Sequence, residues 1–149
     1  EKACSFKDYN CGHVFSLEGG IVIKTGQLNH PNGACGYRIE FEGKVIAICT
    51  DTEHFEGRVD DNVVNLAQDA DIMVYDSAYT DEEYQNFKGW GHSTWQEALK
   101  VAETANVKET FLFHHDPSHN DEKMDQIAQE VASIRSGVRP AIEGQTITI

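Results

Sequence analysis

Short apolar runs that alternate with stretches of helical spacing constrain the fold of this chain most strongly. The runs are residues 45–49, 72–75 and 111–113. Between the last two, a stripe of apolar residues follows Thr94, and a further stripe follows Asp121. Buried strands that alternate with amphipathic helices are typical of the α/β class. The sequence therefore predicts a mixed sheet with helices on one face.

Antiparallel strands are predicted on the N-terminal side of this region. Residues 36–41 alternate in hydrophobicity, a Glu-Gly turn follows, and residues 45–49 return as the second arm of a hairpin. An earlier strand runs from Ile21 toward Leu28, whereas residues 1–19 show little period and predict a loop or a ragged edge. At the other end, residues 141–149 predict a closing hairpin around a second Glu-Gly turn.

Length and charge limit the classes of function. The 149 residues predict a single domain, 1–149, and 12 basic against 25 acidic residues give a net charge of -13. This charge argues against long nucleic acid as a partner, but a small anionic substrate held by metal ions stays open because bound cations dominate the local field. No apolar run is long enough to span a membrane, so no membrane association is predicted.

The four cysteines lack the tight spacing of a zinc knuckle, and we expect a cytoplasmic location. Cys35 and Cys49 sit in strand-like runs and are predicted to be buried thiols. A zinc site formed by Cys4, Cys11 and His13 is an alternative to a loop with incidental thiols, and the loop is favoured.

Polar residues that end successive elements predict a metal-assisted hydrolytic site. His30 follows the first strand, Asp51 ends the hairpin, and His115 ends a buried strand. Imidazole and carboxylate groups that converge from several element ends are what a dinuclear hydrolytic site requires. His92 precedes a helix, as a mobile acid should, and Asp76 ends a strand from which it could orient His92.

Each of these residues also has a simpler interpretation. His30 could be a turn residue, Asp51 a helix cap, and His92 a spectator beside a cap. His114 and His115 point to opposite faces if their strand persists, so at least one of them is a packing or solvated residue. The joint placement at element ends favours the functional interpretation over the separate ones.

The order of these motifs resembles the C-terminal half of the metallo-β-lactamase superfamily, and most of all the branch that holds ribonuclease Z and bacterial cyclic-phosphodiester hydrolases. The resemblance runs from about Ile21 to the end, and the His-Ser-Thr element at residues 92–94 is its most specific part. It implies half of an αββα sandwich. The motifs that carry it are residues 28–31, 36–38, 50–53, 75–79, 91–94 and 112–115.

The resemblance implies roles residue by residue. His30, Asp51 and His115 match metal ligands, with Asp51 as the bridging aspartate and His114 as the neighbour that could be confused with His115. His92 matches the proton donor to the leaving oxygen, and Asp76 falls where ribonuclease Z carries a carboxylate that orients this histidine. The implied cofactors are two divalent metal ions, zinc for preference, with manganese or iron as alternatives.

The first metal cluster of the family, His-x-His-x-Asp-His, is absent, because no His-x-His occurs among the 7 histidines. The chain is therefore expected to be a fragment, or to receive the other half from a second polypeptide, and an exposed sheet face favours a homo-oligomer or a tight association.

The implied function is hydrolysis of a small cyclic or nucleotide-like phosphodiester by a hydroxide held between two metal ions. A thioester or lactone hydrolase of the same superfamily and a non-catalytic interaction domain are the alternatives.

Overall fold

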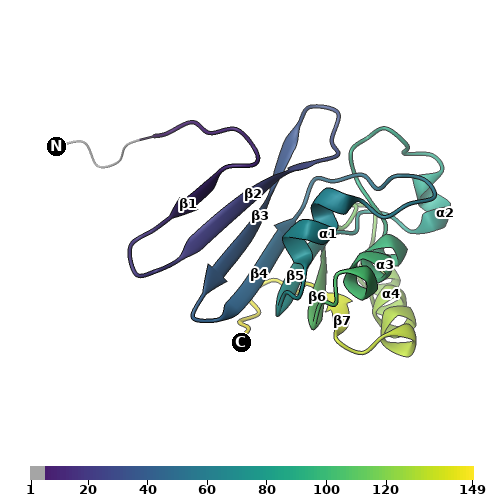
Figure 1. The fold of residues 1–149 in the computed structure, drawn as a ribbon. Helices are drawn as coiled ribbons and strands as arrows, with labels where there is room; N and C mark the ends of the chain where they lie inside the picture. The colour runs from purple at the N-terminus through teal and green to yellow at the C-terminus, as the bar shows by residue number, and fades with distance from the viewer. Residues whose placement is uncertain (1–5) are drawn as a thin grey trace.

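A seven-stranded mixed sheet organises the chain, and its strands lie in the order in which they occur in the sequence (Figure 1). The computed structural model describes residues 6–149. The first four strands pair antiparallel and the last four pair parallel, which confirms the predicted α/β class. The strands are β1 (Val14–Ser16), β2 (Val22–Leu28), β3 (Ala34–Phe41), β4 (Lys44–Cys49), β5 (Ile72–Asp76), β6 (Glu109–Phe113) and β7 (Val138–Pro140).

Side-chain caps fix where the helices begin. The Thr94 hydroxyl accepts a hydrogen bond from the Glu97 N–H, and Asn120 caps the last helix in the same way. The predicted helix starts after Thr94 and at Asp121 are confirmed. In the described part of the chain, no helix has the length and apolarity that crossing a bilayer requires. The helices are α1 (Asp61–Ala67), α2 (Asp81–Tyr84), α3 (Trp95–Thr104) and α4 (Asp121–Ile134).

One continuous hydrophobic core joins three of the helices to the sheet. It contains residues of α1, α3 and α4 together with alternate residues of the central strands. Leu66 of α1 lies close against β2 and β3, where a Cβ added at Gly36 would be 2.7 Å from the Leu66 Cδ1 atom. The glycine is therefore needed for this close approach. Fully buried members of the core include Ala47, Cys49, Val63, Met73, Ala98, Val101, Leu112 and Val131.

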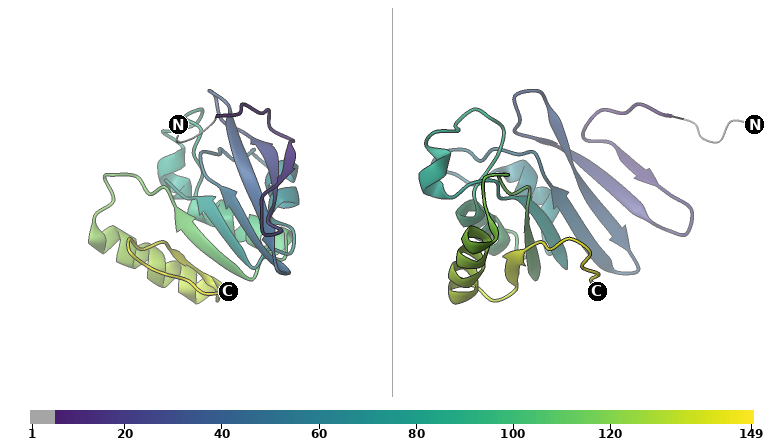
Figure 2. Two further views of the ribbon diagram at one scale, coloured as in Figure 1. Left: turned by 90° about the vertical axis from the view of Figure 1, so that its left-hand side faces the viewer. Right: turned by 180° about the vertical axis from the view of Figure 1, so that it is seen from behind.

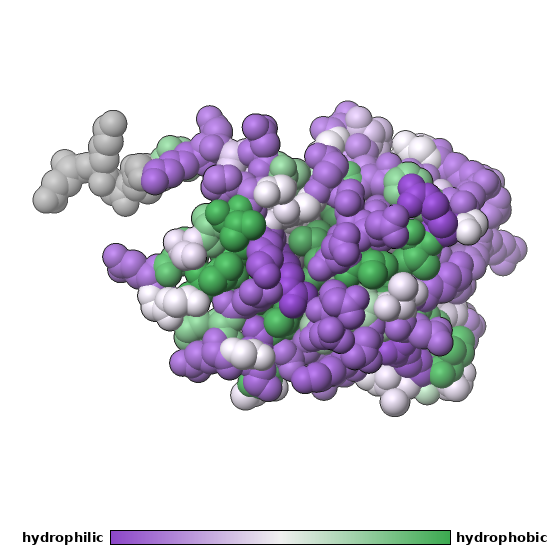
Figure 3. Space-filling model, in the orientation of Figure 1, coloured by the Kyte–Doolittle hydropathy of each residue, from purple (hydrophilic) through white to green (hydrophobic). Residues whose placement is uncertain are grey.

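The opposite side of the sheet carries a row of isoleucines. Ile23, Ile39, Ile46 and Ile72 are register partners across four neighbouring strands. The first three are only partly buried, and the C-terminal segment crosses this face near β3 and β4 (Figure 2, right). In the view of Figure 3, hydrophobic surface also gathers over the N-terminal strands. The sheet thus keeps apolar surface that the helices do not cover.

The structure is more definite than the sequence at one chain end and differs from it at the other. The segment predicted as a loop or a ragged edge contains β1, a three-residue edge strand paired with β2. The predicted closing hairpin over residues 141–149 is absent: a turn forms at residues 143–144, but no strand flanks it. The final strand is instead β7, which pairs parallel to β6, because the chain returns through α4 and so meets β6 in the parallel direction.

Candidate functional site

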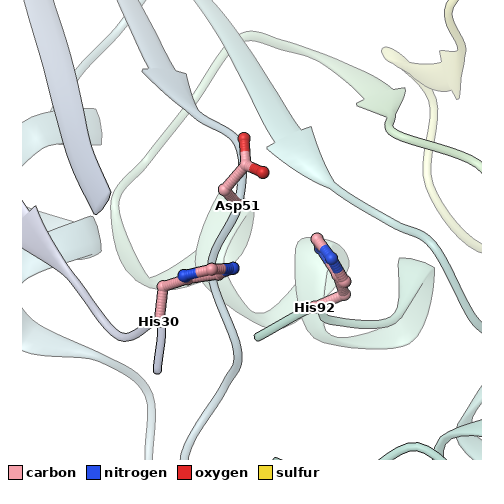
Figure 4. Close-up of side chains that lie close together, drawn as sticks. All are labelled: His30, Asp51 and His92. Carbon is pink, nitrogen blue, oxygen red and sulfur yellow. The ribbon is translucent and has the colours of Figure 1, made fainter. Parts of the chain in front are cut away.

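The candidate residues gather at one edge of the sheet. Since β2, β4, β5 and β6 run in the same direction, their carboxyl ends lie at a common edge. His30 follows β2, Asp51 follows β4, and His114 follows β6. Asp76 is the last residue of β5, and His92 comes from the loop before α3. Figure 4 shows His30, Asp51 and His92 around a common space.

The side chains of this edge are close enough to share a cation. Ligand atoms of His30, Asp51 and His92 all lie within 4.8 Å of one another, and the same holds for Asp76, His92 and His114. The His114 Nε2 atom is 3.4 Å from the Asp51 Oδ1 atom. Imidazole nitrogens and carboxylate oxygens are the donor set of zinc, manganese and iron sites. The residues present therefore fit a divalent metal ion.

A buried carboxylate holds His92. The Asp76 side chain is 0% exposed, and its Oδ2 atom lies 2.9 Å from the His92 Nδ1 atom. Its two oxygens also accept hydrogen bonds from the backbone N–H groups of Thr52, Ala78 and Ser93. The hydrogen bond with Asp76 raises the pKa of His92 above its ordinary value, against the effect of burial. The structure therefore contains the contact between Asp76 and His92 that the sequence led us to expect.

Two strands end in strained backbone at the site. Asp51 has a φ of 58° and His114 a φ of 66°, so both adopt the left-handed backbone conformation that residues other than glycine rarely take. Such residues cost on the order of 1–3 kcal/mol each and cluster at functional sites. At these two positions the turn directs the side chains of Asp51 and His114 toward each other.

His115 lies elsewhere. It belongs to neither group of close ligand atoms, and both of its ring nitrogens are buried without a hydrogen-bond partner among the described residues. Burial lowers the pKa of His115. The alternation that separates two neighbouring side chains ends with the strand at Phe113, and the left-handed turn at His114 then decides which histidine meets Asp51. The assignment of His115 as a ligand stays a prediction that this geometry does not favour.

The N-terminal zinc alternative involves Cys4, Cys11 and His13. Cys4 lies outside the described residues. Within residues 6–149, Cys11 and His13 belong to no group of close metal-ligand atoms. Cys49 is buried as predicted, whereas Cys35 is only partly buried.

Residues to which the sequence assigned no role of their own complete the surroundings of the cluster. Glu53 accepts hydrogen bonds from the backbone N–H groups of Gly89 and Gly91, in the turn just before His92. A Cβ added at Gly91 would lie 2.2 Å from the His30 Cδ2 atom. The two glycines on either side of Trp90 were a visible signal of a tight turn, but nothing in the sequence links them to Glu53 or His30.

Comparison with known proteins gives one family match and several relatives. A family model described as the β-lactamase superfamily domain matches residues 9–115. Ribonuclease Z of Bacillus cereus (strain G9842) is 26% identical over 138 residues, which cover 93% of this chain and 41% of that protein. Ribonuclease Z of Bacillus thuringiensis (strain Al Hakam) is 27% identical with the same coverage. The chain spans about two fifths of the length of these relatives.

Solved structures share the fold at low sequence identity. The metallo-β-lactamase fold protein YhfI from Bacillus subtilis superposes with a TM-score of 0.74 at 19% identity, covering 92% of this chain and 53% of that chain. Human tRNase Z, short form, gives a TM-score of 0.66 at 24% identity, and the match covers 91% of this chain and 46% of that chain. A diphosphatase from the PhnP family gives a TM-score of 0.68 at 17% identity, and the match covers 93% of this chain and 47% of that chain. These likenesses confirm the predicted fold class.

Proposed function

Because the chain belongs to the metallo-β-lactamase superfamily, we propose that it forms part of a metal-dependent hydrolase that cleaves a small cyclic or nucleotide-like phosphodiester. The observation that carries the proposal is the convergence of His30, Asp51 and His92 within 4.8 Å, with the buried carboxylate of Asp76 behind His92. The names of the relatives, ribonuclease Z and a PhnP-family diphosphatase, support phosphorus chemistry. The net charge of -13 favours a small substrate over long nucleic acid.

His30, Asp51 and His114 are the residues of this chain that we assign to the metal ions. His114 takes the place expected for His115, because its Nε2 atom faces the Asp51 carboxylate at 3.4 Å. The complete site is proposed to hold two divalent cations, zinc for preference and manganese or iron as alternatives. When bound, such cations supply Lewis acidity and lower the pKa of water.

His92 is proposed to act as the general acid. Its Nδ1 atom is engaged by Asp76, so its Nε2 atom is left for the substrate. The raised pKa of His92 keeps the imidazole protonated to higher pH, which suits proton transfer to a departing alkoxide. A thioester or lactone hydrolase of the same superfamily has no need of such an acid, so the His92–Asp76 pair favours the phosphodiesterase.

Metal analysis and hydrolysis by the complete protein test this function together. We expect about two equivalents of divalent metal per chain, together with turnover of alkyl phosphodiesters that stops when a chelator removes the metal. A complete protein that binds no metal and cleaves no diester, thioester or lactone would instead be a non-catalytic interaction domain, and the proposal would fail.

The two neighbouring histidines can be separated by their effect on metal content. In the complete protein, His114→Ala is expected to reduce bound metal to about one equivalent, because it removes a nitrogen beside Asp51. His115→Ala is expected to keep about two equivalents, because its ring lies outside both ligand groups. Metal is counted on protein whose circular dichroism is unchanged. The opposite pattern would return the ligand role to His115.

A further polypeptide layer is proposed to cover the isoleucine face and to supply the missing ligands. The Asp51 and His114 side chains are 46% and 38% exposed, and the row formed by Ile23, Ile39 and Ile46 is only partly buried. The relatives are more than twice as long as the matched segment. We propose that the covering layer corresponds to the part of those proteins that this chain does not span.

Sedimentation of the 149-residue chain checks this proposal. Partly exposed apolar rows normally pair with other surfaces, so the isolated chain is expected to self-associate, and to form a defined complex when it is co-expressed with the remaining polypeptide. A stable monomer that does not bind this polypeptide would contradict the proposal.

We also propose a cytoplasmic location. The three cysteines that the structure describes, Cys11, Cys35 and Cys49, are free thiols, as expected in a reducing compartment.

A further inference from the structure

The Glu53 carboxylate holds both ends of the turn that precedes His92. Glu53 is 9% exposed, and its Oε1 atom accepts hydrogen bonds from the Gly89 N–H at 2.7 Å and the Tyr84 hydroxyl at 2.7 Å. Its Oε2 atom accepts from the Gly91 N–H at 2.9 Å. Because the two oxygens belong to one rigid group, they fix the separation of the two glycine amides. His92 follows Gly91 directly, so the turn determines the position of the His92 backbone and therefore of its imidazole.

The backbone of the same residue is tied to the His30 loop. The Glu53 N–H donates to the Asn29 carbonyl oxygen at 2.7 Å, and the Asn29 side-chain amide donates to the Glu53 carbonyl oxygen at 2.8 Å. Asn29 immediately precedes His30, and Glu53 follows Asp51 by two positions. A single residue therefore connects the three loops that carry His30, Asp51 and His92.

Three hydrogen bonds compensate for the burial of the Glu53 carboxylate. Removing a carboxylate from water is unfavourable unless other groups replace its hydration. The three donors to Glu53 are neutral, and two of them are backbone N–H groups of the turn before His92. Hydrogen bonds from backbone amides to a charged acceptor are stronger than those to a neutral one. The carboxylate thus orders a turn in which both glycines have positive φ.

We propose that Glu53 is a positioning residue, which sets the place of His92 relative to His30 and Asp51 through the Gly89–Gly91 turn. Glu53 belongs to neither group of close ligand atoms, so we assign it no direct contact with the metal ions. The effect on catalysis rests on the proposed function, whereas the effect on the turn does not.

Glu53→Gln in the complete protein tests the proposal. A glutamine has one acceptor oxygen, so one of the two glycine amides must face an NH₂ group and lose its hydrogen bond. With glycine labelled by ¹⁵N, we expect the amide exchange of Gly89 or Gly91 to become about tenfold faster or more. The kcat for an alkyl phosphodiester should fall about 10- to 100-fold with KM changed less than about twofold, because His92 is misplaced while substrate binding is kept.

Tyr84→Phe is the matched control. It removes one donor to the same carboxylate and leaves both glycine hydrogen bonds in place. We expect the exchange of both glycine amides, and the kcat, to stay within about twofold of the wild type. For Glu53→Gln, a nitrophenyl diester should be largely spared, since its leaving group departs without a proton.

Three outcomes separate the alternatives. Unchanged amide exchange in Glu53→Gln would overturn the proposal. Equal losses of kcat in Glu53→Gln and Tyr84→Phe, on both substrates, would also overturn it, since they would show a general loss of stability. If the wild type cleaves no diester, the proposed function fails, and amide exchange alone then decides whether Glu53 orders the turn.

Discussion

His92→Ala in the complete protein is expected to slow the hydrolysis of alkyl phosphodiesters by about 10²–10⁴-fold. An alkoxide is a poor leaving group and needs a proton as it departs. We propose that in this chain the proton comes from the imidazole of His92, whose Nδ1 atom is hydrogen-bonded to Asp76. Steady-state kinetics should place the loss in kcat, because the acid acts on the leaving oxygen in the transition state.

A nitrophenyl diester serves as the control substrate, since nitrophenolate departs unprotonated. We expect His92→Ala to retain most of its activity on this substrate and to keep its full metal content. Equal loss on both substrates, or loss of metal, would mean that His92 is a ligand, as its closeness to His30 and Asp51 also allows.

Asp76→Asn should show a milder version of the same pattern, with an additional shift in pH dependence. The hydrogen bond with Asp76 raises the pKa of His92, so the acid stays protonated to higher pH, and activity falls as the pH rises through that raised value. Removing the carboxylate charge lowers the pKa of His92, so this fall should move to lower pH. If Asp76→Asn leaves the pH profile for an alkyl diester unchanged, Asp76 does not set the pKa of the catalytic acid, and the prediction is wrong.

Gly91→Ala is expected to cause the second large effect. The new Cβ would lie 2.2 Å from the His30 Cδ2 atom and 2.8 Å from the Pro31 Cδ atom. Either His30 or the turn must move, and a displacement of about 1 Å near a reacting centre can cost on the order of 100-fold in rate. We expect a loss of this size in kcat/KM, together with weaker metal binding measured by titration.

Gly89→Ala is the matched comparison for Gly91→Ala. Gly89 has a φ of +83° and Gly91 a φ of +92°, so both substitutions strain the backbone in a similar way. Both amides donate to Glu53, but a Cβ at Gly89 would meet nothing within 4 Å. The difference between the two variants therefore isolates the contact with His30. Similar metal affinities in both variants would show that His30 is not displaced.

Much of the sheet and the helices could be predicted from local patterns. The runs at residues 45–49 and 72–75 became β4 and β5, and the threonine cap before Trp95 set the start of α3. Hydrophobic periodicity and helix caps depend on residues that are close in the sequence, so a single sequence is enough to recognise them. β1 was missed because a three-residue edge strand has too few positions to show a period. The closing hairpin was wrong because a turn signal does not provide a partner strand.

The site was predictable where residues end strands or precede a helix. His30, Asp51 and Asp76 lie at strand ends, and His92 precedes α3. The structure brings their side chains together in two groups that share His92. The choice between His114 and His115 depends on a backbone φ of 66° at His114, which the alternation rule does not contain.

Glu53 was missed for a different reason. Its donors lie 31 to 38 positions further along the chain, so no local pattern connects them to the carboxylate.

The agreement of strand order with chain order has a consequence for synthesis on the ribosome. Each new strand joins the edge left by the one just before it, so no strand has to insert between two earlier ones. Loop closure between neighbouring elements is less costly in entropy than closure between distant ones. The sheet can therefore grow from its N-terminal hairpins as the chain emerges. With His114 as a metal ligand, this donor reaches the site only after β6 has joined, while α4 and β7 are still to come.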